Sequence, residues 1–308
     1  MRVVVTGASG FLGRSVLTEL DARGLDVVAV SRRPRLAVGS ESCRMLSSPE
    51  DAIEVRELLR SANPQIVIHL AGISSVANYA DLYQANAVFA ANLLDASLAM
   101  PQPPLVLLTG SAAEYGPVPE AQLPVGEDFP CRPNTAYGIS KLAQTGHALA
   151  ARSRGLAVVV ARLFNPIGGG MPQTLALGSF AHQIAQMGAR GGVLRTGDLD
   201  VVRDFIDVAV AANLLVELAL KHAGSEAIVN ICSGQGQNLL TVTRRLIELA
   251  GLPIELVHDA SRRGNSNVRS FVGNSSVLRS LGLNPSPPDM DLLLEKILRN
   301  ARLELGAA

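Results

Sequence analysis

Two residues that can do acid–base chemistry, Tyr137 and Lys141, stand four positions apart in the stretch YGISK. On a helix this spacing places both side chains on one face. An ammonium group beside a phenol favours the phenolate and lowers the pKa of the tyrosine. Tyr137 can then act as a general acid or base on a carbonyl or hydroxyl oxygen. The alternative is an ordinary helix surface, because this spacing also arises by chance.

A serine, Ser111, follows an apolar run at 105–109 that predicts a strand. At the end of a strand its hydroxyl can hydrogen-bond a reacting oxygen and help to transfer its proton. A serine that merely caps a loop is the alternative. The presence of Tyr137 and Lys141 in the same chain favours the catalytic interpretation.

A glycine-rich stretch, TGASGFLG at 6–13, follows a short apolar strand and opens a helix at Phe11 and Leu12. Gly7 permits a tight turn, Gly10 lets a pyrophosphate approach the backbone, and Gly13 lets the helix pack closely on the strand. The N-terminus of a helix also favours an anion. This context predicts a dinucleotide site rather than a plain glycine turn.

The second strand ends in Ser31-Arg32-Arg33. An NAD site usually has an acidic residue here for the ribose 2′-hydroxyl, whereas an arginine accommodates the 2′-phosphate of NADP. A guanidinium group binds phosphate through two hydrogen bonds. We therefore expect NADP(H), with NAD(H) as the less favoured cofactor, and Arg32 rather than Arg33 beside Ser31 as the phosphate ligand. The alternative is a solvated basic loop.

The elements around these motifs alternate between strands and helices. Continuous apolar strands between helices predict a parallel sheet covered on both faces. The predicted fold class is α/β, a Rossmann-type doubly wound parallel sheet with a smaller C-terminal substrate-binding lobe, and with ligands at the carboxyl ends of the strands. The expected strands lie at 3–5, 26–30, 66–70, 105–109 and 156–161, and the expected helices at 11–23, 50–62, 81–99 and 135–153.

The second half is richer in glycine and proline, beginning at 165–173. An NADP-binding Rossmann domain is expected at 1–164, with 203–231 returning to it, and a substrate-binding lobe at 165–202 and 232–308. In this half a strand is expected at 227–231 and short strands from about 252, and the expected helices lie at 175–188, 207–222, 239–250 and 289–303.

The composition excludes several classes of partner. Lys plus Arg and Asp plus Glu both number 27, and the resulting zero net charge does not favour nucleic acid or an anionic membrane. No apolar run approaches the roughly 20 residues of a membrane span. The three cysteines are far apart, which predicts reduced thiols and no metal site. Since no targeting segment is visible, we expect a cytoplasmic protein.

Several stretches together resemble the extended short-chain dehydrogenase/reductases over nearly the whole chain. They are TGASGFLG at 6–13, HLAG at 69–72, SAAEYG at 111–116 and YGISK at 137–141. The second half resembles the nucleotide-sugar branch of that family, and is most similar to GDP-4-keto-6-deoxy-D-mannose reductases. That likeness rests on RLFNPIG at 162–168, GDLDVVRDFIDV at 197–208 and VNICSG at 229–234.

The resemblance implies roles for the matching positions. Ser111, Tyr137 and Lys141 would form the catalytic triad, with Tyr137 and Lys141 also touching the cofactor. Its place at the end of a strand, rather than the resemblance, predicts that His69 is a packed, hydrogen-bonded histidine with no part in proton transfer. Further cofactor contacts are implied for Leu70, Ala71, Gly72, Phe164 and Ile167. Substrate contacts are implied for Ser74, Ser111, Ala112, Asn165, Arg203 and Arg262, the two arginines (or Arg263 in place of Arg262) binding the diphosphate.

Three positions depart from the pattern of this branch. Its dehydratases carry an acidic residue where this chain has Ala113, and Glu114, one place later, is expected to face elsewhere. Dehydration is therefore not expected. In the tail, RRGNSN at 262–267 replaces the usual Arg-Pro-x-Asp, which leaves the nucleotide base open. Ser47-Ser48 replaces an Asp that usually holds adenine.

The expected reaction is reduction, by NADPH, of a nucleoside-diphosphate 4-keto-6-deoxy sugar, with hydride to C4 and a proton from Tyr137. A nucleotide-sugar 4-epimerase with tightly bound NAD(P) would use the same triad. A catalytically silent NADP-binding regulator would be expected to lose the Tyr or the Lys. The resemblance also implies a homodimer formed through the helices at 81–99 and 135–153, whose alanines allow close packing.

Overall fold

The first strand distributes its side chains between two layers of helices. In the computed structural model, which describes residues 1–32, 42–74, 78–221, 224–262 and 268–306, β1 (Arg2–Thr6) buries Val3 and Val5 on one side and Val4 on the other. Successive strand residues point to opposite faces. An unbroken run of valines therefore serves both layers.

All strand pairings in the main sheet are parallel, and its order is β10-β6-β5-β4-β1-β2-β3. The strand order reverses between β1 and β4, and such a switch point leaves a crevice at the carboxyl ends of the strands. The predicted doubly wound fold is thus confirmed. Besides β1, the strands are β2 (Asp26–Ser31), β3 (Ser42–Met45), β4 (Ile66–His69), β5 (Leu105–Ser111), β6 (Val158–Leu163) and β10 (Ile228–Ile231).

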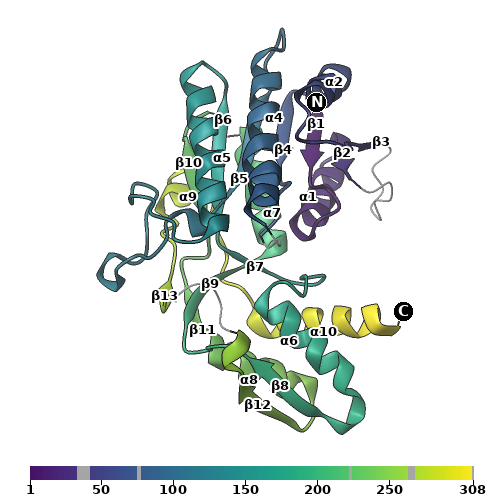
Figure 1. Ribbon diagram of the computed structural model, residues 1–308, viewed down its shortest axis with the longest axis vertical. Helices are drawn as coiled ribbons and strands as arrows, with labels where there is room; N and C mark the ends of the chain where they lie inside the picture. The colour runs from purple at the N-terminus through teal and green to yellow at the C-terminus, as the bar shows by residue number, and fades with distance from the viewer. Residues whose placement is uncertain (33–41, 75–77, 222–223, 263–267, 307–308) are drawn as a thin grey trace.

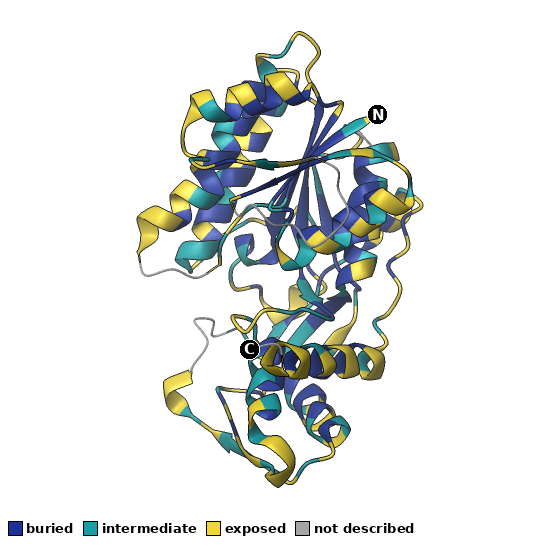
Figure 2. Ribbon diagram, turned by 90° about the vertical axis from the view of Figure 1, so that its right-hand side faces the viewer, coloured by how far each residue is buried: buried dark blue, intermediate teal, exposed yellow. Residues whose placement is uncertain are grey.

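Two helical layers cover this sheet. On one face, α1 (Phe11–Ala22) and α7 (Val208–Lys221) pack against Val3 and Val5. On the other, α2 (Ala52–Ala62), α4 (Phe89–Leu98) and α5 (Ala136–Ser153) enclose the opposite strand side chains. Figure 2 shows the strands buried along their length and the outer faces of the helices exposed. None of the helices in the described ranges is both long and apolar enough to cross a bilayer.

The helix expected at 81–99 is interrupted. It begins as α3 (Tyr79–Tyr83), widens into a π-helical segment at Gln84–Val88, and continues as α4. π-Segments inside helices often occur at functional sites. In this chain the segment contains Asn86, a fully buried side chain beside the cavity described below.

A second core lies below the sheet in Figure 1. It is formed by α6 (Ala176–Met187), α8 (Leu239–Ala250) and α10 (Met290–Gly306), together with the parallel pair β8 (Gly192–Thr196) and β12 (Ile254–His258). Strand β9 (Val202–Asp207) joins this part to the sheet. It pairs with β7 (Asn165–Ile167), β11 (Gly236–Asn238) and β13 (Ser270–Phe271).

The chain passes repeatedly between the two cores. Helix α7 and β10 return to the sheet, while β12, α10 and Phe205 of β9 belong to the lower core. Helix α9 (Ser276–Ser280) departs from the predicted lobe boundary of 232–308. Its Leu278, with Leu283, packs in the same core as α1 and α7, because the tail crosses back to the sheet beside β10.

Candidate active site

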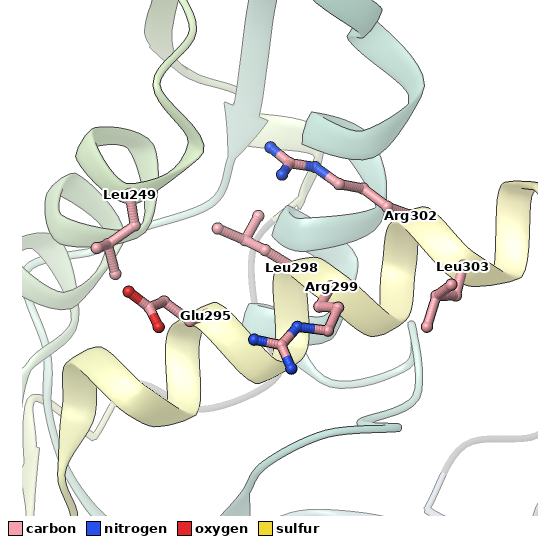
Figure 3. Close-up of a pocket in the computed structure, with 6 residues that line it drawn as sticks. All are labelled: Leu249, Glu295, Leu298, Arg299, Arg302 and Leu303. Atoms are coloured by element: carbon pink, nitrogen blue, oxygen red, sulfur yellow. The ribbon is translucent and has the colours of Figure 1, made fainter.

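A cleft of about 1410 Å³ lies between the carboxyl edge of the sheet and the lower core. The sheet side supplies Ser111, Tyr137 and Lys141, and the lower side supplies Arg203 and several other cationic side chains. A smaller hollow of about 410 Å³ lies between α8 and α10 (Figure 3). It contains Glu295, Arg299 and Arg302 but no residue of the catalytic set. The larger cleft is therefore the candidate active site.

The glycine turn at the end of β1 has room for main chain only. Gly7 has φ +69°, and a Cβ there would lie 2.6 Å from the Ala71 nitrogen. A Cβ on Gly13 would lie 2.2 Å from the Gly7 carbonyl oxygen. Gly10 precedes α1 as its N-cap and provides no side-chain cap. Uncapped N–H groups at a helix N-terminus suit a phosphate, so this turn fits the predicted pyrophosphate cradle.

The end of β2 lies next to that turn. Ser31 is buried, and its hydroxyl donates a 2.9 Å hydrogen bond to the Ser9 hydroxyl in the glycine loop. Arg32 follows with an exposed side chain. Arg33, the other arginine considered, lies outside the described residues. Since Arg32 directly follows Ser31 in the chain and is exposed, its role as the phosphate ligand stays a prediction.

Local contacts bring the three predicted catalytic side chains to one end of the cleft. Ser111 ends β5, and its hydroxyl accepts a hydrogen bond from the Ala113 N–H at 3.2 Å. Tyr137 and Lys141 lie in the first two turns of α5, whose N-cap Thr135 accepts from the Gly138 N–H. A Cβ on Gly138 would lie 2.5 Å from the Ala113 carbonyl oxygen, so glycine lets α5 start against the Ser111 turn.

The pKa of Tyr137 departs from the sequence-based expectation. Burial raises this pKa above its usual value, and the negative charge of Glu114 adds to the rise. Hydrogen bonding by Ser111 acts in the opposite direction. The expected lowering counted the charge of Lys141 but not the loss of solvent around the phenol. In the protein by itself Tyr137 is therefore a protonated acid, the form that donates a proton to a carbonyl oxygen.

Lys141 points its ammonium group at neutral acceptors. Its Nζ donates to the Thr109 carbonyl oxygen at 2.6 Å and to Gln144 Oε1 at 2.5 Å. The side chain is only 5 % exposed, and burial lowers its pKa to about 8. Since the amine lines the cleft, its third N–H is suited to a ligand hydroxyl.

His69, at the end of β4, is buried beneath this site. Its Nδ1 shares a 2.8 Å hydrogen bond with the Thr6 hydroxyl, but its Nε2 is buried with no hydrogen-bond partner. The expectation of a fully hydrogen-bonded histidine is thus only half correct. Burial, with the nearby charge of Lys141, lowers the His69 pKa to about 3. The ring is therefore neutral at physiological pH.

The remaining predicted residues divide into two groups. Leu12, Leu70, Gly72, Phe164, Ser74, Ala112 and Asn165 line the cleft with the catalytic side chains. Ala71, by contrast, packs against the helix layer. Ile167 is fully buried in the lower core, next to the cleft-lining Asn165 and Pro166, so the cofactor contact implied for this turn stays a prediction.

The lower wall of the cleft is cationic. Arg203 lies in β9, and its guanidinium donates to the carbonyl oxygens of Val202 and Val268, at 2.8 and 2.9 Å, while burial lowers its pKa. Arg262 lines the cleft as expected, and its Nε lies 3.5 Å from Asp259 Oδ2. Sequence reasoning missed three further basic side chains of this wall, which are Arg195, His258 and Arg269. Strand β8, which carries Arg195, was also missed, whereas β12, which carries His258, is one of the short strands expected from about 252.

Asn86 is the other residue that was missed. Its side-chain oxygen accepts from the Ile73 N–H at 2.9 Å, and its amide donates to the Ile73 carbonyl oxygen and to the Ser140 hydroxyl. Asn86 thus ties the loop after β4 to α5 next to Lys141. The helical stretch at 81–99 contains two asparagines, Asn86 and Asn92, and nothing in the sequence singles out Asn86 as the buried one.

Comparison with known proteins agrees with this geometry. Residues 3–232 match the NAD dependent epimerase/dehydratase family, so the chain belongs to that family and is an NAD(P)-dependent enzyme of the extended short-chain dehydrogenase/reductase type. It is 33% identical over 284 residues to GDP-6-deoxy-D-mannose reductase of Pseudomonas aeruginosa, which covers 90% of this chain and 89% of that protein. The predicted family resemblance is confirmed.

A further relative and a solved structure cover almost the whole chain. UDP-glucose 4-epimerase of Corynebacterium glutamicum is 29% identical and covers 96% of this chain and 94% of that protein. Among solved structures, that of RMD from Pseudomonas aeruginosa complexed with NADPH superposes with a TM-score of 0.81. It has 30% identity and covers 98% of both chains. Reductase and epimerase relatives therefore share this fold over nearly its full length.

Proposed function

We propose that this protein is an NADPH-dependent reductase of a nucleoside-diphosphate 4-keto-6-deoxy sugar. The observation that carries the proposal is a single cleft with Ser111, Tyr137 and Lys141 at one end and Arg203 and Arg262 on the opposite wall. The first three suit a carbonyl oxygen, and the two arginines suit a diphosphate. The similarity to a GDP-6-deoxy-D-mannose reductase supports the same substrate class.

The cofactor cradle is the glycine turn at 7–13, with Arg32 at the ribose 2′-phosphate and Leu70 and Gly72 beside it. When bound, the dinucleotide supplies the hydride that reduces C4 of the sugar. Lys141 donates to a ribose hydroxyl through the N–H that Thr109 and Gln144 leave available. The exposed position of Arg32, together with a relative solved with NADPH, favours NADP(H) over NAD(H).

The proton chemistry belongs to Tyr137. With its raised pKa the phenol is protonated at neutral pH and donates its proton to the oxygen at C4. Ser111 hydrogen-bonds the same oxygen and polarises the carbonyl. Asn165 and Ser74 contact the sugar nucleotide, while Ala112 and Ala113 leave no carboxylate there to eliminate water.

An epimerase is the second candidate. The same triad can remove and return hydride at C4, and a UDP-glucose 4-epimerase is among the relatives. An epimerase keeps its cofactor between turnovers, whereas a reductase exchanges it in each cycle. An arginine at the end of β2 favours the exchanging NADP(H) enzyme.

A homodimer is part of the proposal. Helices α4 and α5 lie side by side on one face of the sheet (Figure 1), and Val88, just before α4, and Ile139 and Leu149 in α5 are about two-fifths exposed, at 38%, 42% and 40%. A second copy covering this face would bury them in a four-helix bundle. Sedimentation of the protein at micromolar concentration, with Ile139→Glu as the disrupting variant, tests this assembly.

The deciding experiment measures binding of NADPH and NADH to dialysed protein and identifies any nucleotide released on denaturation. We expect protein free of nucleotide, reversible binding that prefers NADPH, and loss of that preference in Arg32→Ala. NADPH should then be oxidised in the presence of a nucleoside-diphosphate 4-keto-6-deoxy sugar but not by Tyr137→Phe. A stoichiometric NAD that survives dialysis would instead identify the epimerase.

A further inference from the structure

We propose that Glu114 is a positioning residue whose carboxylate clamps the end of β5, which carries Ser111, to α5, which carries Tyr137 and Lys141. The kinetic test of this inference rests on the proposed function, whereas the NMR test below does not. Glu114 occupies the place next to the absent dehydratase acid, and its side chain turns away from the cleft into the protein, where it is fully buried.

Both carboxylate oxygens of Glu114 are engaged, and each binds a different part of the site. Oε1 accepts a 2.7 Å hydrogen bond from the Ser111 N–H. Oε2 accepts from the Thr145 hydroxyl at 2.8 Å and from Arg162 Nε at 2.9 Å. The carboxylate therefore bridges strand β5, helix α5 and strand β6 at one point.

The contact on α5 is placed to align the catalytic face of the helix. Thr145 lies four residues beyond Lys141 and eight beyond Tyr137, so the three side chains project from the same face. A fixed hydrogen bond at Thr145 limits rotation and sliding of the helix relative to β5. The distance between Ser111 and Tyr137 is then determined by one buried group rather than by loops.

Residues of β5 and β6 pack closely around the Glu114 carboxylate. A Cβ on Gly110 would lie 2.6 Å from Glu114 Oε1, so glycine is needed where the side chain passes the strand. Arg162 is 3% exposed, stands opposite Gly110 in the β5–β6 register and lies 4.6 Å from the centre of the Tyr115 ring. The Tyr115 ring thus gives the guanidinium a second contact besides Glu114, which helps to keep the ion pair in place.

A purely structural role would need only the ion pair with Arg162, whereas a clamp also needs the hydroxyl of Thr145. Thr145→Val separates these roles, because it removes that hydroxyl while leaving both charges and the side-chain shape. Thr243→Val is the matched control. Thr243 is also fully buried in a helix, but its hydroxyl bonds only the Leu239 carbonyl oxygen in α8, away from the catalytic end.

The test compares steady-state kinetics of the full-length variants with NADPH and a nucleoside-diphosphate 4-keto-6-deoxy sugar. In Thr145→Val we expect kcat to fall about 10-fold with both KM values unchanged, and in Glu114→Gln about 100-fold, since small misplacements of reacting groups have effects of this size. Thr243→Val should match the wild type. Equal kcat in the two threonine variants would overturn the clamp.

A second readout does not depend on the substrate. The chain has 4 tyrosines, so Tyr137 can be assigned in the NMR spectrum of tyrosine-labelled protein by its loss in Tyr137→Phe. We expect the Tyr137 signal to shift in Thr145→Val and the Ser111 amide to exchange faster in Glu114→Gln, with neither change in Thr243→Val. An inactive wild type with these shifts present would refute the proposed function alone. Unchanged spectra would refute the clamp alone.

Discussion

The cleft has buried charges on both sides, but they are stabilised in different ways. On the catalytic side Glu114 is paired with Arg162, and the carboxylate raises the pKa of the guanidinium. On the lower side Asp204 accepts its hydrogen bonds from the Ser233 N–H and hydroxyl and from the N–H groups of Gly234 and Gly273, all neutral donors. Burial raises the pKa of Asp204 in spite of these bonds.

Lys141 resembles Asp204 rather than its own neighbours. Its acceptors are also neutral, and burial moves its pKa towards neutrality, to about 8. An opposite charge beside the buried Arg162 thus raises its pKa and stabilises its charged form. Burial among neutral partners instead shifts the pKa of Lys141 and of Asp204 in the direction that favours the uncharged form.

The largest expected loss of stability follows from breaking the ion pair between Glu114 and Arg162. Glu114→Gln leaves a buried guanidinium without its counter-charge and should lower the free energy of unfolding by about 3–5 kcal/mol. Arg162→Gln should cost a similar amount. The double variant should cost less than the sum of the two, because it removes both charges. Urea unfolding of all three tests this, and additive losses would show that the pair is not coupled.

A smaller change in stability should follow from the titration of Lys141 as the pH rises. Its folded-state pKa of about 8 lies below the ordinary 10.5, so between these values the unfolded chain holds a proton that the native state has lost. Stability of the wild type relative to Lys141→Met should therefore rise with pH across this window, by on the order of 3 kcal/mol. Urea unfolding at several pH values checks it. A flat difference would mean that Lys141 is solvated in the folded protein.

Asp204→Asn should cost about 2 kcal/mol, less than Glu114→Gln. The variant keeps one oxygen for Ser233 but turns an amide towards the N–H groups of Gly234 and Gly273. No buried counter-charge is stranded among the groups that bond Asp204. A loss as large as that of Glu114→Gln would remove the distinction between the two sides of the cleft.

The smallest effect concerns the pH dependence of that same variant. Because the folded-state pKa of Asp204 is raised above 3.8, the native state takes up its proton first as the pH falls. The wild type should then gain stability relative to Asp204→Asn as the pH falls through the folded-state pKa, and the difference should be constant well above it. Thermal melts over mildly acidic pH measure this, and a change of the opposite sign would contradict burial as the cause.

Local patterns made much of the site predictable. The glycine turn before α1 and the four-residue spacing of Tyr137 and Lys141 depend on neighbours in the chain, and the structure has both as expected. The direction of Glu114, away from the reacting groups, was also anticipated. Its partner was not, because Arg162 lies 48 residues further on and only the β5–β6 register brings it close.

The failures have physical causes too. The pKa of Tyr137 was expected to fall, but burial, which no spacing reveals, raises it. Strands β8 and β9 were missed because polar and charged residues interrupt their short apolar runs. The sequence pattern also did not reveal that Leu278 and Leu283 return to the core of the sheet.

That return of the tail has a consequence for how this enzyme can be varied. The residues of the lower core come from α6 and β8, then from α8 and β12, and finally from α10, with segments of the sheet's own core between them. No single cut in the chain releases the part that would recognise the sugar nucleotide. Replacing the lower core with that of a relative, in order to change the sugar nucleotide that is bound, would need several segments to be exchanged together. Single substitutions of residues that line the cleft should therefore change the substrate more readily.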